Sequence, residues 1–328
     1  MPKSLKQKEK LLRILEILER KTDEDHYIST RELIEELSKY DIEAERKSIY
    51  DDIDVLKNMG YDIRLSKAKD KSGYCLLSRR LDKSEIMPLV DAVACSRFIT
   101  EKKSRKLIKK LEGFLSVYEA GALNRDVLVT DRIKSENESI FYVTDAVSTA
   151  IAKKVYVTFK YCEYNVDKKL VERNKGKIYK VYPLTLSWND ERYYIIGIDF
   201  ERNEIRHYRC DKIKDINVTS EPLKDRSLIE GFDIVNYENM TFGMYGGDKE
   251  AVTLSFPEKL CGVIIDRFGK EPTFRKHDNG IISARVNVNV SPQFYGWLLG
   301  LGPEVKIVGP DNVKENFKKY LKNVYDLY

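Results

Sequence analysis

Two arginines stand close together in the segment IRHYRCDKI, residues 205–213. Arg206 and Arg209 lie on either side of His207, and Lys212 follows shortly after them. A guanidinium group binds a phosphate or a carboxylate through two parallel hydrogen bonds, so this segment could hold an anionic ligand. Neighbouring carboxylates could instead neutralise both arginines in structural salt bridges. The candidates for that second role are Asp199, Glu201, Glu204 and Asp211.

The alternating pattern of this segment predicts a β-strand, in which successive side chains point to opposite faces. Arg206 and Tyr208 then share one face, while Ile205 and His207 share the other, and Arg209 opposes Arg206. The two arginines can converge on one ligand only if a bulge near Tyr208 breaks the alternation. A buried guanidinium without a partner is costly, so each must reach water, a carboxylate or an anionic ligand.

The sequence lacks the motifs that mark common classes of enzyme. It has no G-x-S-x-G, no Walker loop and no dinucleotide fingerprint, and the GLG of residues 300–302 precedes Pro303, which indicates a turn. Asp51, Asp52 and Asp54 are close in sequence, but helical spacing spreads them around the axis. We therefore predict no catalytic residues and no enzyme.

Metals and cofactors are not expected either. The cysteines are odd in number and form no C-x-x-C, and histidines are few, so no metal cage is predicted. Reduced, buried thiols in a cytoplasm are the simplest interpretation. The residues concerned are Cys75, Cys95, Cys162, Cys210, Cys261, His26, His207 and His277.

Composition indicates a soluble protein of two or three domains, with 42% hydrophobic and 34% charged residues in a chain of 328. The longest apolar runs, residues 155–159 and 193–198, fall far below the ~20 residues of a membrane helix. The first residues contain no apolar signal core, so we expect a cytoplasmic protein without membrane contact. The net charge of +5 is only mildly basic and does not by itself indicate nucleic-acid binding. The distribution of charge along the chain is the more informative signal.

Residues 1–80 predict a winged helix-turn-helix DNA-binding domain. Hydrophobic periodicity indicates helices within residues 5–20, 29–40 and 45–60, the second with a cap at Ser29 or Thr30 and Glu32 in its first turn. Two alternating segments around a polar tip then predict a hairpin, the wing.

The start of the third helix is where such a domain meets base edges in the major groove of double-stranded DNA. The residues off its apolar face are Arg46, Lys47, Ser48 and Tyr50. Asp51 and Asp54 add negative charge beside this face. We expect Asp51 to accept from a base such as cytosine, or to be neutralised by Arg46 or Lys47.

The hairpin region, residues 61–83, has seven basic residues against three acidic ones, a local excess of +4. The tip residues predicted to contact phosphates are Lys67, Lys69 and Lys71. The other basic residues of the region are Arg64, Arg79, Arg80 and Lys83. A lysine-rich tip can equally be a solvated turn.

Residues 81–137 predict a helical connector, with an apolar face interrupted by Pro88. A dense basic cluster on it consists of Lys102, Lys103, Arg105, Lys106, Lys109 and Lys110. This cluster is either a solvated helix face, a second phosphate-contacting stripe or part of a dimerisation helix.

Residues 138–222 predict a helix followed by several short strands with polar turns, typical of a small, strongly bent antiparallel sheet or barrel. Residues 246–328 predict the order βαββαβ(α), a ferredoxin-like pattern, with the DNG of residues 278–280 as a turn and Trp297 as a core anchor. The fold class is therefore α+β and multidomain.

The third helix, RKSIYDDIDVLKNMG, resembles the recognition helix of DeoR-like and YafY-like bacterial regulators. The matching residues are Arg46, Lys47, Ser48, Ile49, Asp52, Ile53, Leu56 and Gly60. Asp51 stands where the family often has arginine. The resemblance implies a DNA-binding regulator.

The middle region resembles a WYL domain. Pro183, Leu184 and Leu186 match its opening, Tyr193, Tyr194 and Ile195 replace the name-giving triplet, and residues 205–213 match its final block. WYL domains resemble Sm-like barrels and are thought to sense a ligand, often a nucleotide or nucleic acid. The resemblance implies that an anionic effector contacts Tyr161, Ser187, Tyr194, Arg206, His207, Arg209 and Lys212.

The last region resembles the C-terminal extension that follows WYL domains, with matches at Trp297, Gly302, Val305 and Pro310. Such an extension implies dimer contacts. Together the resemblances imply a ligand-responsive transcriptional regulator, a repressor by family habit, that binds DNA as a homodimer. The alternative is an accessory protein that binds single-stranded DNA or RNA directly, for example with a defence system.

Overall fold

The computed structural model describes residues 3–68, 72–126, 134–223, 230 and 233–328. The chain divides into two compact units, Met1–Glu136 and Asn137–Tyr328. None of the described helices is long and apolar enough to cross a membrane. Lys69 and Lys71 of the predicted hairpin tip lie outside the described residues.

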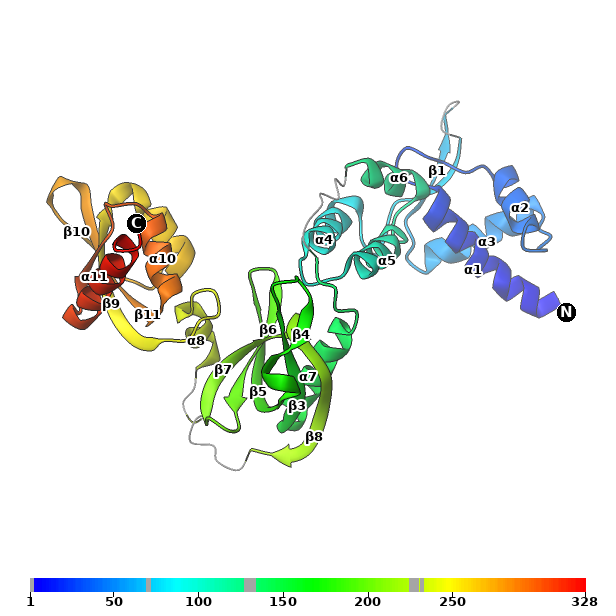
Figure 1. Cartoon of the computed structure of the whole chain (residues 1–328). Helices are drawn as coiled ribbons and strands as arrows, with labels where there is room; N and C mark the ends of the chain where they lie inside the picture. The colour runs from blue at the N-terminus through cyan, green and yellow to red at the C-terminus, as the bar shows by residue number, and fades with distance from the viewer. Residues whose placement is uncertain (1–2, 69–71, 127–133, 224–229, 231–232) are drawn as a thin grey trace. The chain divides into compact units, whose positions relative to one another are not determined.

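The first unit begins with three helices, α1 (Lys3–Lys21), α2 (Thr30–Ser38) and α3 (Arg46–Asn58) (Figure 1). The predicted cap of α2 is confirmed. The Ser29 hydroxyl accepts from the Glu32 N–H, and the Glu32 carboxylate accepts from the Ser29 N–H. Apolar side chains of all three helices share one buried core.

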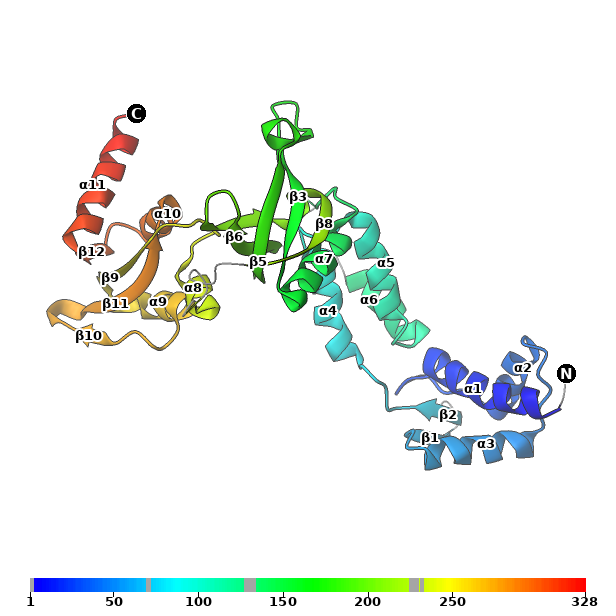
Figure 2. The same ribbon diagram turned by 90° about the horizontal axis from the view of Figure 1, so that it is seen from below.

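A hairpin, β1 (Ile63–Lys67) and β2 (Ser72–Leu76), follows α3 (Figure 2). Ile28, between α1 and α2, forms a β-bridge with Tyr74 of β2. Gly73 permits this approach, because a Cβ there would lie 2.3 Å from the Ile28 carbonyl oxygen. The backbone of the helical region is thus bonded directly to the hairpin.

Three further helices complete the first unit, α4 (Lys83–Cys95), α5 (Glu101–Glu112) and α6 (Val117–Asp126). Pro88 lies inside α4 without ending it. The Ser116 hydroxyl caps α6 by accepting from the Glu119 N–H, and it donates to Asp23 at 2.6 Å. The helical prediction is confirmed between residues 83 and 126.

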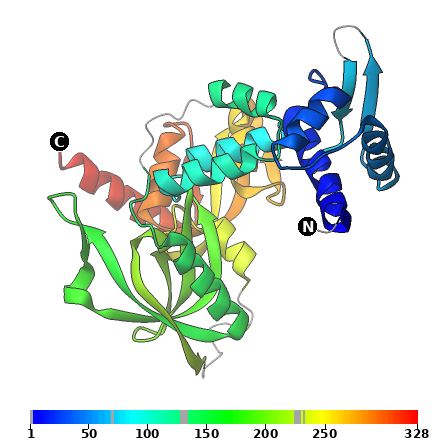
Figure 3. The ribbon, with the colours of Figure 1, turned by 90° about the vertical axis from the view of Figure 1, so that its right-hand side faces the viewer.

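The second unit opens with α7 (Ile140–Lys153), which packs against three strands of an antiparallel sheet (Figure 3). The strand order is β4-β3-β5-β6-β7, and β8 pairs with β3. A 3₁₀ turn, Cys210–Lys212, joins β7 to β8. The strands are β3 (Val155–Tyr164), β4 (Leu170–Glu172), β5 (Ile178–Asn189), β6 (Arg192–Asp199), β7 (Glu204–Arg209) and β8 (Ile213–Pro222).

The hairpin between β5 and β6 turns through Asp190 and Glu191, with φ of 46° and 59°. Two central residues with positive φ are typical of a type I′ turn, whose twist matches that of the flanking strands. This turn fixes the register that pairs Ser187 with Tyr194.

The C-terminal part has the predicted order of elements, preceded by a short helix that was not predicted, α8 (Ile234–Met240). Its antiparallel sheet runs β10-β11-β9-β12. One sheet face, with α9, α10 and α11, buries the core, and Trp297 packs against it beside Phe242 and Phe268. The elements are β9 (Asp248–Pro257), α9 (Cys261–Phe268), β10 (Phe274–Lys276), β11 (Ile281–Val290), α10 (Pro292–Gly300), β12 (Lys306–Gly309) and α11 (Asp311–Tyr325).

Candidate functional site

The start of α3 exposes three of the four residues predicted to contact bases. Arg46 and Lys47 are exposed, and Tyr50 keeps 46% of its surface open to solvent. In the part of the chain that the structure describes, no ion pair joins Asp51 to Arg46 or Lys47. The face can therefore donate to guanine through its cations and accept from cytosine through Asp51.

Ser48, the fourth, lies against α1. Lys10 of α1 donates to the Ser48 hydroxyl, and its Nζ lies 2.7 Å from Asp52 Oδ2. The Lys10 side chain is only 8% exposed, so this ion pair links α1 to α3 inside the domain. The structure gives Ser48 an internal partner that the sequence did not reveal.

The hairpin presents fewer cations than its sequence indicates. Lys67 is exposed at the end of β1. The Arg79 side chain, by contrast, is only 6% exposed, and its guanidinium donates to the carbonyl oxygens of Glu19 at 2.6 Å and of Thr22. It also lies 3.6 Å from the Glu119 carboxylate. Arg79 thus links α1 to α6 and is not free to contact phosphate.

Each arginine of β7 has a carboxylate partner two residues away. Arg206 Nη2 lies 3.1 Å from Glu204, and Arg209 binds Asp211 through Nε at 3.0 Å and Nη2 at 2.6 Å. Pairing of β7 with β6 runs from Glu204 to Arg209 without a shift, so no bulge brings the two arginines together. The salt-bridge alternative is realised for both, and they occupy opposite faces.

Arg209 nonetheless belongs to a group of predicted ligand contacts. Ser187 pairs with Tyr194, and Tyr194 pairs with Arg209, so the three lie in one row across β5, β6 and β7 on the same face. The Tyr161 hydroxyl accepts from the Arg209 N–H at 3.1 Å, and burial raises the pKa of Tyr161 to about 12. The row keeps a neutral phenol beside the guanidinium.

Charged groups of both signs lie around this row, and the carboxylates of Asp211 and Glu163 raise the pKa of Lys212 against the effect of the cations. Burial lowers the pKa of Lys212, and the charge of Arg209 lowers it further. The charge of Arg192, at the start of β6, also lowers the pKa of Lys212. Arg192 has its own ion-pair partner, Asp190, at 3.4 Å. Among the described residues, no hydrogen bond or ion pair is found for Lys212. An anion at this place would relieve the repulsion.

His207 shares the face of Arg209 but is fully engaged. Its Nδ1 lies 2.5 Å from the Met244 carbonyl oxygen, and its Nε2 lies 3.0 Å from the Tyr237 hydroxyl. A carbonyl only accepts, so Nδ1 carries the hydrogen and Nε2 accepts from Tyr237. Burial lowers the pKa of His207, which favours this neutral form. These two hydrogen bonds of His207 connect Tyr237 of α8 and Met244, which follows α8, to strand β7.

Comparison with known protein families gives both parts of the second unit a description. Residues 142–218 match the WYL domain, and residues 248–325 match the WCX domain. The chain therefore contains a WYL domain and a WCX domain. The row of Ser187, Tyr194 and Arg209 lies inside the WYL domain, and Lys212 follows it there.

Solved structures similar to this WYL–WCX protein include Proteasome accessory factor B/C (PafBC) of Arthrobacter aurescens, at 16% identity and a TM-score of 0.29, covering 98% of this chain and 49% of that one. A CRISPR Cas-related protein is similar at 10% identity and a TM-score of 0.36, covering 90% and 77%. The chain spans about half the length of the PafBC chain. No curated protein matches the chain.

Sequence reasoning missed Arg192 of the WYL domain and Tyr237 beyond it. The position of Arg192 directly after the turn could have identified it, since the turn fixes the face of the sheet on which each residue of the following strand lies. Tyr237 carries no such signal, because its contact with His207 joins segments distant in sequence. No cluster of three or more potential metal ligands occurs among the described residues.

Proposed function

We propose that this WYL–WCX protein is a ligand-responsive transcriptional regulator that binds duplex DNA as a homodimer in the cytoplasm. The first unit supplies the DNA-binding head, the WYL domain binds an anionic effector, and the WCX domain joins two copies. None of these roles requires catalysis.

We assign the head, α1 to β2, as a winged helix-turn-helix. Three helices share one core, a capped α2 precedes α3, and a hairpin bonded to the Ile28 segment follows. In this arrangement the start of α3 enters the major groove, and Lys67 on the hairpin contacts phosphate. Arg46, Lys47 and Tyr50 would read bases, since all three are exposed.

We place the effector at the row of Ser187, Tyr194 and Arg209, beside Tyr161 and Lys212. Asp211 uses two of the N–H groups of Arg209, and a guanidinium has five, so donors remain for a phosphate. Arg206 lies on the opposite face with Glu204 and would not reach the same ligand. His207 would instead transmit the state of the row to α8.

The WCX domain is assigned a ferredoxin-like fold and a role in dimerisation. Its sheet order β10-β11-β9-β12 and the helices between its strands support the fold. A dimer would place two heads on half-sites about 34 Å, or a multiple, apart.

The exposed cations at the start of α3 are the observation that carries the proposal. Gel shifts with a genomic duplex library test it, using wild type, Lys47→Ala and the control Lys39→Ala at the exposed end of α2. We expect Lys47→Ala to lower the affinity for the preferred site by about tenfold and the affinity for other duplexes by less, so that sequence preference is relaxed. Lys39→Ala should bind like wild type. Equal losses in both variants would contradict the assignment of α3.

The second candidate function is direct binding of single-stranded nucleic acid by the whole protein. Matching single-stranded probes in the same gel shifts distinguish the two. A clear preference for single strands, with no enriched duplex, would support an accessory nucleic-acid-binding protein and overturn the regulator.

A further inference from the structure

The segment that joins the hairpin of the head to α4, residues 77–82, is held at both of its ends. At its start, the Leu77 N–H donates to the Asp62 carbonyl oxygen at 2.9 Å. At its other end, Asp82 caps α4, and Leu81 packs against the buried core of the connector helices α4 to α6. The segment is therefore too constrained to act as a free hinge between the head and the connector.

Arg79, in the middle of this segment, binds groups from both sides. In the head, its guanidinium donates to the carbonyl oxygens of Glu19 at 2.6 Å and of Thr22. In the connector, it donates to the Phe114 carbonyl oxygen at 3.4 Å and lies 3.6 Å from the Glu119 carboxylate. Separating the head from the connector would take these partners from a buried charge, which is costly.

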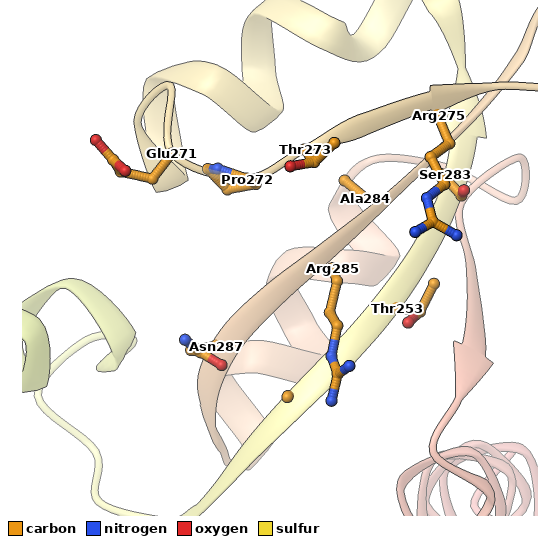
Figure 4. Close-up of a pocket in the computed structure, with 10 residues that line it drawn as sticks. Thr253, Glu271, Pro272, Thr273, Arg275, Ser283, Ala284, Arg285 and Asn287 are labelled. Carbon is orange, nitrogen blue, oxygen red and sulfur yellow. The ribbon is translucent and has the colours of Figure 1, made fainter.

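The arginines of the WCX sheet give a contrast. Arg275 and Arg285 stand on the open face of that sheet, opposite the core, where they line a groove of about 620 Å³ (Figure 4). Both are exposed, as a group that binds a ligand from solution must be. Only 6% of the Arg79 side chain is exposed. Arg79 is therefore placed to join two parts of the chain, not to bind a ligand.

Asp23 makes a second contact between the head and the connector. It lies between α1 and α2 and is buried, and its Oδ1 accepts from the N–H groups of Asp25 and His26. Its Oδ2 accepts from the buried Ser116 hydroxyl of the connector at 2.6 Å. Burial alone would raise the pKa of Asp23, but its hydrogen bonds with Ser116 and His26 lower it. The carboxylate is therefore charged, and a hydrogen bond to a charged acceptor is of the stronger kind.

The rings of His26 and Tyr118 form a third contact. They are stacked, with centroids 3.6 Å apart and planes inclined by 4°. His26 comes from the α1–α2 segment of the head, and Tyr118 from the first turn of α6. Because the His26 Nδ1 lies 2.6 Å from Asp23 Oδ1, the orientation of the ring is fixed from the side of the head.

The last residues of the first unit are bound to the same connector helices. The Lys134 ammonium donates to the Ser96 carbonyl oxygen at 3.1 Å and to the buried Ser104 hydroxyl at 2.9 Å. The Ser135 N–H donates to the Arg97 carbonyl oxygen at 2.9 Å. Contacts of this kind thus run from the head through the connector to Ser135.

We propose that the head and the connector helices form one rigid body, closed by a latch of buried polar and stacking contacts. The latch consists of Asp23, His26, Arg79, Ser116, Tyr118 and Glu119. The latch does not depend on the proposed function, but its consequence for DNA does. An effector in the WYL domain would reorient this body as a whole, and the connector would set the spacing between the two heads of a dimer.

Two variants of the full chain test the latch. Ser116→Asp keeps an oxygen that can cap α6, as the serine does, but places a second carboxylate against Asp23. The control, Thr100→Asp, introduces the same charge at another buried cap, that of α5. The first turn of α5 contains Lys102 and Lys103, so a carboxylate is tolerated there.

Pulsed electron paramagnetic resonance measures the distance between head and connector, with nitroxide labels at Lys39→Cys in the head and Lys109→Cys in α5. The partly exposed Cys95 and Cys261 are replaced by serine in every protein. We expect a single narrow distance distribution in wild type and in Thr100→Asp, and a distribution at least about twofold wider in Ser116→Asp. A wide distribution in wild type, or an unchanged width in Ser116→Asp, would overturn the latch.

Tyr118→Ala provides a second test if Ser116→Asp does not fold. Tyr118 keeps 47% of its surface exposed, so its removal should leave the fold intact, as circular dichroism can verify. Loss of the stack with His26 should widen the distance distribution, and an unchanged width would contradict the latch.

Duplexes with two copies of the preferred site at different spacings separate the latch from the proposed function. Wild type should prefer one spacing by about tenfold, and Ser116→Asp should bind several spacings almost equally. Wild-type selectivity for one spacing in a Ser116→Asp protein with a wide distance distribution would contradict the role of the latch in spacing. If wild type binds no duplex but the label distances behave as expected, the latch stands and only the proposed function fails.

Discussion

At the scale of single residues, function depends on which charged groups the fold leaves without partners. Arg206 and Arg209 are both paired, whereas no partner is found for Lys212 among the described residues, and its pKa is lowered first by burial and then by the charge of Arg209. The arginines are the obvious candidates in the sequence, but Lys212, which follows them, is the better indicator of the candidate site.

His207 gives a prediction about pH. Because burial lowers its pKa, the folded chain resists a proton that the unfolded chain accepts below about pH 6.5. Stability should therefore fall as pH drops through 6.5 toward the lower pKa of the folded state. Thermal unfolding measures this effect at about pH 7.5 and about pH 5.5. The melting temperature should fall less between these two values in His207→Asn, whose amide can still donate to Met244, than in wild type.

A larger or equal loss of stability in His207→Asn would contradict this account of the buried neutral ring. The variant keeps His26 and His277, so the comparison isolates position 207.

Alternation along the strand predicted that Arg206 and Arg209 oppose each other, and the regular pairing of β7 confirms it. The partners of Ser48 and Arg79 could not be predicted in the same way. Ser48 is bound by Lys10 of α1. Arg79 is bound by the carbonyl oxygens of Glu19 in α1 and of Thr22, the residue after it. Periodicity shows which face of an element is buried but not which polar group meets it there.

At the scale of elements, local signals predicted the structure where one short motif decides it. The capping residue Ser29 is an example, since it and Glu32 together fix the geometry of the helix start. Helix α8 was missed, because it has only seven residues and is held by tertiary contacts such as Tyr237 with His207.

Lys67 tests the hairpin as an element. Lys67→Glu should weaken binding to every duplex, by roughly tenfold at moderate salt, and should flatten the salt dependence, because a phosphate contact is replaced by repulsion. Gel shifts of specific and unrelated duplexes at several salt concentrations measure both effects. Unchanged binding would refute the wing assignment, and a loss confined to one sequence would indicate base reading instead.

At the scale of the whole molecule, a net charge of +5 conceals strong local differences. Exposed cations gather at the start of α3, along α5 and on the open face of the WCX sheet, while paired charges cover other surfaces. The WYL and WCX domains were predictable from the motifs that resemble those families, and the family matches confirm both. The ligands were not, because they depend on which cations stay unpaired after folding.

The central claim is that an anion at the WYL row changes how the head binds DNA. Selection of bound genomic duplex fragments tests it most directly, with wild type and Arg209→Ala/Lys212→Ala, each with and without a panel of nucleotides and short oligonucleotides. We predict that both proteins enrich the same duplex sequences, and that an effector changes recovery several-fold for wild type only. An equal effector response in both proteins, or no enriched duplex at all, would contradict the account.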